Sequence, residues 1–283
     1  MLECPRCTVV IPEVSEKCLT CGYYAGPPNV RAAQLPEELA ALEERYQNCL
    51  LTARSNGSIA TLERFSKAVE ASTAVINVDA EFLFSFVNNR NALYANYEHG
   101  VSGHLRKPAE FPHDVTRRTV GSILFGGNAG EIIYAALSLT NFGPESYGPY
   151  ALTLKEVAIS ERATVLENNS FDFVRKHELV PGDSRPPGFV ATWRDRSKLA
   201  VAKLASYISA ETTNDEFESL IMSSTGNRGT DELLEVHVFG TFDINAIASV
   251  KGNSRSGSGD ARDLVRMSKQ HLSEMDIPWI END

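Results

Sequence analysis

The chain has 283 residues, of which 42% are hydrophobic and 23% are charged, so its composition is that of a globular protein and excludes a fibrous or wholly disordered one. Its apolar stretches are broken by polar residues well short of the ~20 residues needed to cross a bilayer, so we expect no membrane partner and a cytoplasmic, reducing location. The net charge of −10 argues against broad electrostatic wrapping of nucleic acid, which depends on clustered lysine and arginine.

The N-terminus carries two CxxC pairs, Cys4-Pro-Arg-Cys7 and Cys18-Leu-Thr-Cys21. Two such turns bring four thiolates to one cation, which is the closed tetrahedral set that structural zinc prefers. Disulfides are disfavoured because the chain has five cysteines and no secretory signal. A redox CxxC would normally stand alone beside a βαβ pattern. We therefore predict a zinc ribbon over residues 1–25, whose metal holds a fold and has no open position for catalysis.

The next predicted unit is a helical hairpin over residues 36–75, which follows a linker rich in Gly and Pro. Pro36 suits the first turn of a helix, Gly57 breaks the run, and Ser58 is in position to cap a second helix. Each helix carries an apolar stripe at three- and four-residue spacing: Leu39, Leu42, Tyr46 and Cys49 in the first, and Ile59, Leu62, Phe65 and Val69 in the second. These stripes must pack on each other, on the larger domain or on another protein.

Residues 76–283 are predicted to form an α+β domain, because helices and strands mix there without a regular βαβ alternation. The pattern predicts strands at 82–87, 150–157, 163–166 and 233–239, and helices at 89–100, 131–139, 198–208 and from a cap at Asp260 onward. Residues 101–128 show no period, and segments of that length in compact domains are usually functional or mobile loops.

The strand at 233–239 contains the residues most suited to chemistry. Period-two geometry places Glu235 and His237 on one face, and Leu234, Val236 and Val238 on the other. A carboxylate flanked by apolar residues costs free energy unless it is paired or lies in a cleft. Two interpretations stay open: an edge strand with its polar face in water, or a glutamate that bonds a hydroxyl or stabilises positive charge in a pocket.

Three segments carry a resemblance to a known family. Residues 231–244, Asp-Glu-Leu-Leu-Glu-Val-His-Val-Phe-Gly-Thr-Phe-Asp-Ile, resemble the closing strand and following turn of bacterial ADP-ribosyltransferase-like toxin domains, in which a glutamate opens a strand ending in histidine, apolar residues and glycine. Residues 147–165 are similar to the segment that such domains place before an Asp-Ser or Asn-Ser turn, here Asn169-Ser170. Residues 84–100 are similar to their opening strand and helix. The resemblance covers the chain from roughly Phe82 to Val250 and leaves the ribbon, the hairpin and the last helix outside.

The resemblance implies transfer of ADP-ribose from NAD to a macromolecular acceptor, either nucleic acid or protein, by a toxin or defence effector. Breaking the bond to nicotinamide builds positive charge on the ribose, and a carboxylate can stabilise that charge, so Glu235 is the catalytic candidate. The residue two positions earlier is Leu233, so the second glutamate of an ExE motif is missing. That absence points away from arginine side chains as the acceptor. An antitoxin or other inhibitory partner is a further implication.

The resemblance also suggests which residues hold NAD. The family usually anchors the dinucleotide through an Arg or His on its first strand, where this chain has Ser85-Phe86. Asn88 and Arg90 lie just past that strand and are considered as substitutes. Tyr94 is a candidate for stacking on nicotinamide or adenine, although core packing is the competing role. Thr164 is a candidate for binding ribose or phosphate.

Two further interpretations belong to other classes of protein. Ser170, Asp172 and His177 could imitate a hydrolytic triad, although no G-x-S-x-G elbow accompanies them. The chain could also be a non-catalytic zinc-ribbon interaction or regulatory protein, whose α+β domain binds a partner. The classes differ at Glu235, because a transferase needs this carboxylate beside a cleft sized for a dinucleotide, whereas a binding protein could leave it in water.

Overall fold

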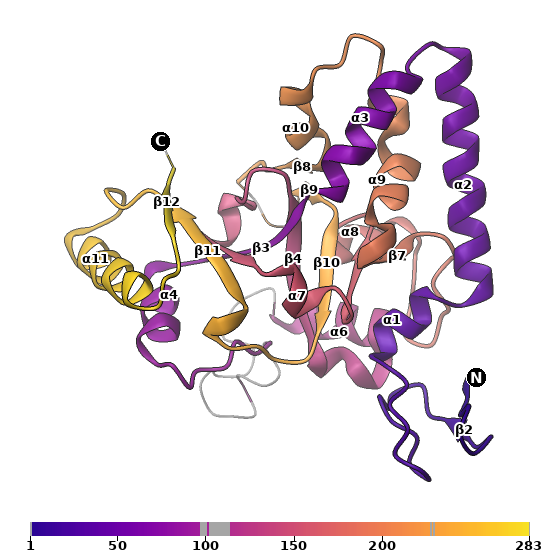
Figure 1. The fold of residues 1–283 in the computed structure, drawn as a ribbon, viewed down its shortest axis with the longest axis horizontal. Coiled ribbons are helices and arrows are strands. Elements are labelled where there is room, and N and C mark those ends of the chain that lie inside the picture. The colour runs from indigo at the N-terminus through magenta and orange to yellow at the C-terminus, as the bar shows by residue number, and fades with distance from the viewer. Residues whose placement is uncertain (1, 97–100, 102–113, 227, 229, 283) are drawn as a thin grey trace.

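The computed structural model describes the chain except for residues 1, 97–100, 102–113, 227, 229 and 283. Its described residues form a central sheet in the order β12-β11-β5-β3-β4-β10-β6-β7, with helices packed around it (Figure 1). Neighbouring strands are antiparallel, except that β11 and β12 are parallel. The strands are β3 (Thr73–Val78), β4 (Ile132–Ser138), β5 (Tyr150–Leu154), β6 (Ala163–Leu166), β7 (Val190–Thr192), β10 (Glu235–Phe239), β11 (Ile247–Gly252) and β12 (Trp279–Glu281). The predicted α+β class is confirmed.

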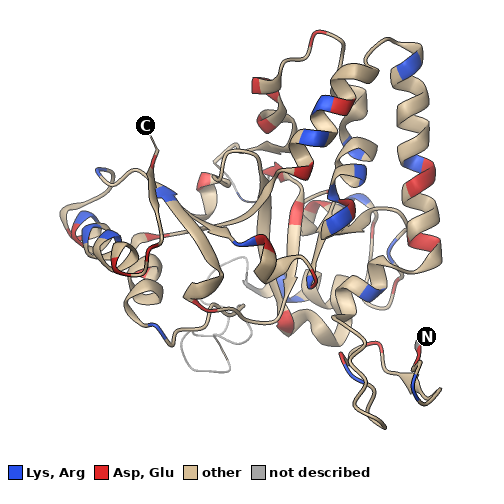
Figure 2. Ribbon diagram, in the orientation of Figure 1, with Lys and Arg blue, Asp and Glu red and all other residues tan. Residues whose placement is uncertain are grey.

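The described helices are α1 (Pro28–Ala33), α2 (Pro36–Ser55), α3 (Ile59–Glu70), α4 (Ala80–Asn88), α6 (Asp114–Phe125), α7 (Glu156–Ile159), α8 (Ser170–Lys176), α9 (Arg196–Leu204), α10 (Phe217–Ile221) and α11 (Gly259–Glu274). None of them is both long enough and apolar enough to span a membrane. Figure 2 shows that α2, α3 and α11 each carry both signs of charge, so none of these helices presents a purely basic surface.

The two helices of the predicted hairpin, α2 and α3, pack chiefly on α9, which lies between them in Figure 1. Three of the four residues of the α3 stripe, Leu62, Phe65 and Val69, are at most 1% exposed, and Ile59 is partly buried. The Phe65 ring meets the Phe217 ring of α10 edge to face, with 5.2 Å between centroids. The hairpin therefore buries its apolar side against the larger domain, one of the three possibilities left open by the sequence.

Two elements differ from their predictions. Residues 82–87 belong to helix α4 and not to a strand, because the Asp79 carboxylate caps the helix by accepting a hydrogen bond from the Phe82 N–H at 2.7 Å. The buried residues Leu83, Phe86 and Val87 then follow helical spacing. Residues 131–139 were predicted helical but form β4, whose continuous apolar run is buried on both faces of the sheet.

Smaller corrections concern the segments around α6 and α11. No helix follows α4 in residues 89–96, and residues 97–100 of that predicted helix lie outside the described residues. The unstructured segment predicted for 101–128 contains α6 in its described part. The last helix is present, but Ser258 caps it by accepting from the Ala261 N–H, so Asp260 lies inside the first turn.

The ribbon at residues 1–25 has a small core of its own. A short antiparallel pair, β1 (Leu2–Glu3) and β2 (Val10–Ile11), flanks the first CxxC turn. Cys4, Ile11 and Cys18 form its buried centre, which is separate from the main core. The ribbon is joined to α1 by Arg31, whose Nη2 donates to the Pro12 and Glu13 carbonyl oxygens.

Candidate functional site

A cavity of about 490 Å³ lies where β3, β4 and β10 meet α6. This volume is within the ~300–1,000 Å³ typical of small-molecule sites. The described residues that line the cavity provide two carboxylates, three guanidinium groups and several aromatic rings. The polar and aromatic residues that line it are Asn77, Asp79, Phe82, Tyr94, Asn96, Arg117, Arg118, Tyr134, Tyr147, Arg228 and Glu235.

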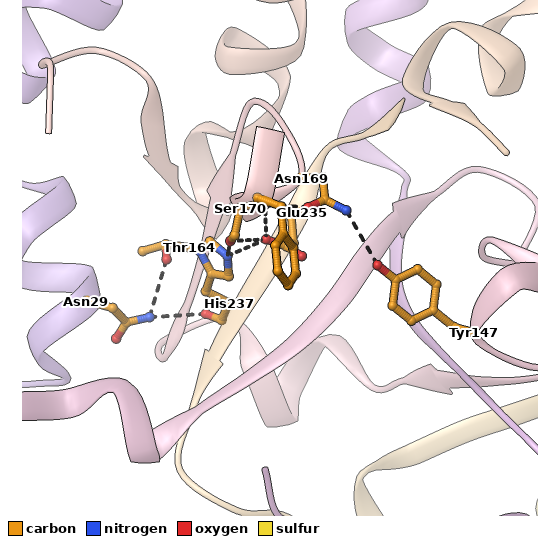
Figure 3. Close-up of polar contacts among 8 residues, drawn as sticks. Asn29, Tyr147, Thr164, Asn169, Ser170, Glu235 and His237 are labelled. Carbon is orange, nitrogen blue, oxygen red and sulfur yellow. Dashed lines mark hydrogen bonds and ion pairs between the residues drawn. The ribbon is translucent and has the colours of Figure 1, made fainter. Parts of the chain in front are cut away.

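Glu235 opens β10 and is 7% exposed. Strand β10 lies between β4 and β6, so the prediction of an edge strand facing water is wrong. His237 lies on the same face, as period two predicted, and its Nε2 is 3.0 Å from Glu235 Oε2. Leu234, Val236 and Val238 are fully buried in the main core on the opposite face. The sheet therefore shelters one carboxylate at the edge of the cavity (Figure 3).

Ser170 supplies two more hydrogen bonds to the same carboxylate oxygen. Its backbone N–H donates to Glu235 Oε2 at 2.9 Å, and its Oγ also contacts this oxygen. The residue starts α8, and Asn169 caps that helix through its Oδ1, which accepts from the Phe171 N–H at 2.9 Å. Asn169 Nδ2 lies 3.4 Å from the Tyr147 hydroxyl (Figure 3). The Asn-Ser turn that carried part of the resemblance thus lies against Glu235.

A hydrolytic triad is not assembled from the predicted residues. Asp172 pairs with Arg175, and the His177 ring packs against Phe173 and Phe189. Ser170 contacts His237 instead, with 3.2 Å between Oγ and Nε2, but Glu235 bonds that same ring nitrogen. A triad needs the serine on one histidine nitrogen and the acid on the other, and Ser170 is only 1% exposed.

Tyrosines form much of the cavity wall. Burial raises the pKa of Tyr147 to about 12, with the charge of Glu235 as the second cause. Burial and Glu235 also raise the pKa of Tyr134. Tyr94 stacks on Phe242 with 4.9 Å between centroids, and burial raises its pKa to about 12. All three hydroxyls stay protonated near neutral pH, so they can donate hydrogen bonds into the cavity.

Of the five candidate NAD-binding residues, one lies in the cavity and four lie elsewhere in the fold. Tyr94 lines the cavity with Glu235. Ser85, Asn88 and Arg90 are exposed at α4 and the turn after it, and are not among the described residues that line the cavity. Thr164 is also outside the lining, since it is buried on β6, where its Oγ1 is 3.4 Å from Asn29 Nδ2.

The sequence analysis assigned neither Arg117 nor Arg228 to the site. Arg117 lies on α6, and its positive charge opposes the rise in the pKa of Tyr94, Tyr134 and Tyr147. Arg228 lies over the Tyr147 ring, 4.8 Å from its centroid, and its Nε donates to the Ser146 carbonyl oxygen at 2.8 Å. The sequence signal for Arg117 was the Arg117-Arg118 pair, which lies in the segment predicted to have no periodic structure. Arg228 lies in a polar turn with no motif, so no signal pointed to it.

The four N-terminal cysteines lie close together, as predicted, and could bind a metal such as zinc. Their sulfur atoms all lie within 4.8 Å of one another. The Cys4–Cys21 and Cys7–Cys18 sulfur pairs are each 3.5 Å apart. Tetrahedral zinc with Zn–S bonds of ~2.3 Å places sulfurs ~3.8 Å apart, so the donor set fits such a metal.

No protein-family model matches the chain, and no curated protein matches its sequence.

Proposed function

We propose that the chain transfers ADP-ribose from NAD to a macromolecular acceptor, with Glu235 as the catalytic carboxylate. The observation that carries the proposal is the position of Glu235, which is buried on a central strand yet lines a cavity with aromatic and cationic walls. Loss of nicotinamide from NAD builds positive charge on the ribose. A sheltered carboxylate stabilises that charge strongly, because water does not screen it.

The other cavity groups match the remaining parts of NAD. The guanidinium groups of Arg117 and Arg228 suit a pyrophosphate, since arginine binds phosphate oxygens through planar, charge-assisted hydrogen bonds. The rings of Tyr94 and Tyr147 suit stacking on nicotinamide or adenine. Arg117 thereby takes the anchoring role that the resemblance assigned to a first-strand Arg or His.

The nature of the acceptor follows from Leu233, which lies two residues before Glu235. Leu233 lines the cavity where an ExE enzyme would have its second glutamate. With no carboxylate there to activate a guanidinium, the proposal favours a nucleic acid or another protein group over arginine. A toxin or defence role, with an inhibitory partner, is part of the same proposal.

We further infer that the four-cysteine site binds zinc with a structural role. Cys4, Cys7, Cys18 and Cys21 would fill the coordination shell, so the metal would fix the ribbon and take no part in the transfer. The ribbon would then serve as a targeting or neutralisation module attached to α1.

The test is nicotinamide release from NAD, with the Glu235→Gln variant compared with wild type. We expect at least a hundredfold loss in the variant, because the amide keeps the shape but cannot stabilise a cation. Glu232→Gln is the matched control, since Glu232 is an exposed glutamate three residues earlier and does not line the cavity. Equal turnover by wild type and Glu235→Gln would remove Glu235 from the mechanism.

A non-catalytic interaction protein is the competing function. It would bind its partner equally well with glutamate or glutamine at position 235, and purified wild type would release no nicotinamide even with cell extract as the source of acceptor. The burial of Glu235 favours the transferase, because a partner-binding strand needs no sheltered carboxylate beside a cavity.

A further inference from the structure

The two oxygens of the Glu235 carboxylate have different surroundings. Oε2 contacts three donor groups: the Ser170 N–H, the Ser170 Oγ and His237 Nε2. Among the described residues no hydrogen bond reaches Oε1. Oε2 is thus hydrogen-bonded within the protein, and Oε1 is available to a molecule in the cavity.

His237 cannot itself act on such a molecule. It is 1% exposed and is not among the described residues that line the cavity. Its ring is held on two sides, by Phe125 of α6 at 4.8 Å and by Tyr134 of β4 at 5.3 Å between centroids, both edge to face. A ring fixed in this way can hold its neighbour in one orientation.

The bonding pattern fixes the proton on His237. Oε2 of an ionised carboxylate only accepts, so the nitrogen 3.0 Å away must carry the hydrogen for a bond to form. The tautomer with hydrogen on Nε2 and the ring with hydrogen on both nitrogens each meet this requirement. The Ser170 Oγ has its own hydrogen directed at Oε2, and its lone pairs face the same N–H at 3.2 Å.

The geometry points to His237 as a positioning residue for Glu235: its Nε2–H holds Oε2 so that Oε1 faces the ribose. This inference rests on the proposed function, and it adds a second side chain from β10 to the site. Without the histidine, the carboxylate could rotate about its last bond and would spend less time with Oε1 directed into the cavity.

Kinetics of a His237→Phe variant test the role. Phenylalanine keeps an aromatic ring between Phe125 and Tyr134 but removes the donor. We expect kcat for nicotinamide release to fall about tenfold to a hundredfold, the equivalent of one lost charge-assisted hydrogen bond, while KM for NAD changes less than about threefold. His237→Gln, whose amide nitrogen can reach the same oxygen, should recover most of the rate.

His177→Phe is the control, because His177 is also packed against aromatic rings but lies away from Glu235. If His237→Phe fails to fold, His237→Met provides a donor-free side chain of similar volume. A donor-free variant that folds and keeps the wild-type kcat, or a His237→Gln variant as slow as His237→Phe, would overturn the role.

A second measurement does not depend on NAD. Nitrogen NMR of protein labelled on its six histidines identifies His237 by the signal lost in His237→Gln. We expect a slowly exchanging hydrogen on Nε2, which Glu235→Ala makes fast. An Nε2 that carries no hydrogen would overturn the inference, even if wild type releases nicotinamide from NAD. Failure of wild type to release nicotinamide would instead reject the proposed function, while the spectrum still decides whether His237 donates to Glu235.

Discussion

Arg117 and Arg228 bring positive charge to the cavity from two separate elements, α6 and the turn between β8 (Met222–Ser223) and β9 (Glu232–Leu233). If they bind the pyrophosphate of NAD, Arg117→Gln should weaken NAD binding about tenfold to a hundredfold, because a hydrogen bond to a charged group contributes ~1.5–3 kcal/mol. Titration calorimetry with the Glu235→Gln background prevents turnover during the measurement. Arg262→Gln, on the exposed side of α11, should bind as the parent does, and equal affinity of the Arg117 variant would exclude its role.

Asn29 of α1 contacts β10 through its side chain. Its Nδ2 donates to the His237 carbonyl oxygen at 3.1 Å and approaches Thr164 Oγ1 (Figure 3), and it also donates to the Arg162 carbonyl oxygen at 3.2 Å. Asn29→Ala should reduce the free energy of unfolding by ~0.5–1.5 kcal/mol, the net contribution of a buried hydrogen bond, because the Arg162 carbonyl oxygen still accepts from the Phe239 N–H. Asn29→Asp should reduce the free energy of unfolding further. Aspartate has nearly the same volume, but its carboxylate oxygen would face the carbonyl oxygens to which the Asn29 amide donates. Urea unfolding measures both, with the exposed Gln34→Ala as the neutral control.

The candidate site was predictable only where its residues share one strand. Period two placed Glu235 and His237 on one face, and both are buried there. Ser170 lies 65 residues earlier, and its bond to Glu235 depends on β6 and β10 pairing in one register. No pattern within a single element encodes that contact, and the Asn-Ser turn was noticed only through a resemblance.

Among the elements, the amphipathic helices α2 and α3 and the buried strands β5, β6 and β10 were predicted with the right type, whereas α4 and β4 were not. α2 and α3 expose one side, so their stripes stand out against polar neighbours. α4 and β4 are apolar nearly throughout, so both periods fit them and the type cannot be read from spacing alone. The Asp79 cap stabilises the helical form of α4. Pairing with β3 on one side and β10 on the other stabilises β4 as a strand.

The last strand, β12, is held to α11 and to the turn after β11 by one carboxylate, Glu281. Burial alone would raise the pKa of Glu281, but hydrogen bonds from Lys269 and from the Ser254 N–H and Oγ outweigh burial and lower it from 4.5 to about 2. A lowered pKa means that the folded state favours the ionised form. This contribution to stability is therefore complete above pH 4.5 and is lost as the pH falls toward about 2.

We expect Glu281→Gln to lose less stability than wild type between pH 4.5 and pH 2, and to be the less stable protein at neutral pH. The difference should be modest, because the side chain is about half exposed and solvent screens its charge. Thermal unfolding across this pH range measures it, and parallel curves for the two proteins would show that the Glu281 contacts contribute nothing.

For the whole molecule, the ribbon and the larger domain should respond differently to metal removal. The ribbon core consists of its cysteines and a few neighbours, so coordination must supply most of its folding free energy. Its described contacts with the rest include Arg31 to two carbonyl oxygens, Val14 beside Gly127, and the charge of Arg162 near Glu16 and Tyr24. A strong chelator, or Cys4→Ser, should therefore unfold residues 1–25 and leave the sheet intact.

The chain's two tryptophans make this prediction measurable, because Trp193 is buried in the main domain and Trp279 lies on β12. After chelation, tryptophan fluorescence should stay that of the native protein while proteases cut within the first twenty-five residues. Nicotinamide release should also persist, since Glu235 is held by Ser170 and His237 and not by the ribbon. A single cooperative loss of fluorescence, protease resistance and turnover would show instead that the metal holds α1, and through Asn29 the strand β10, in place.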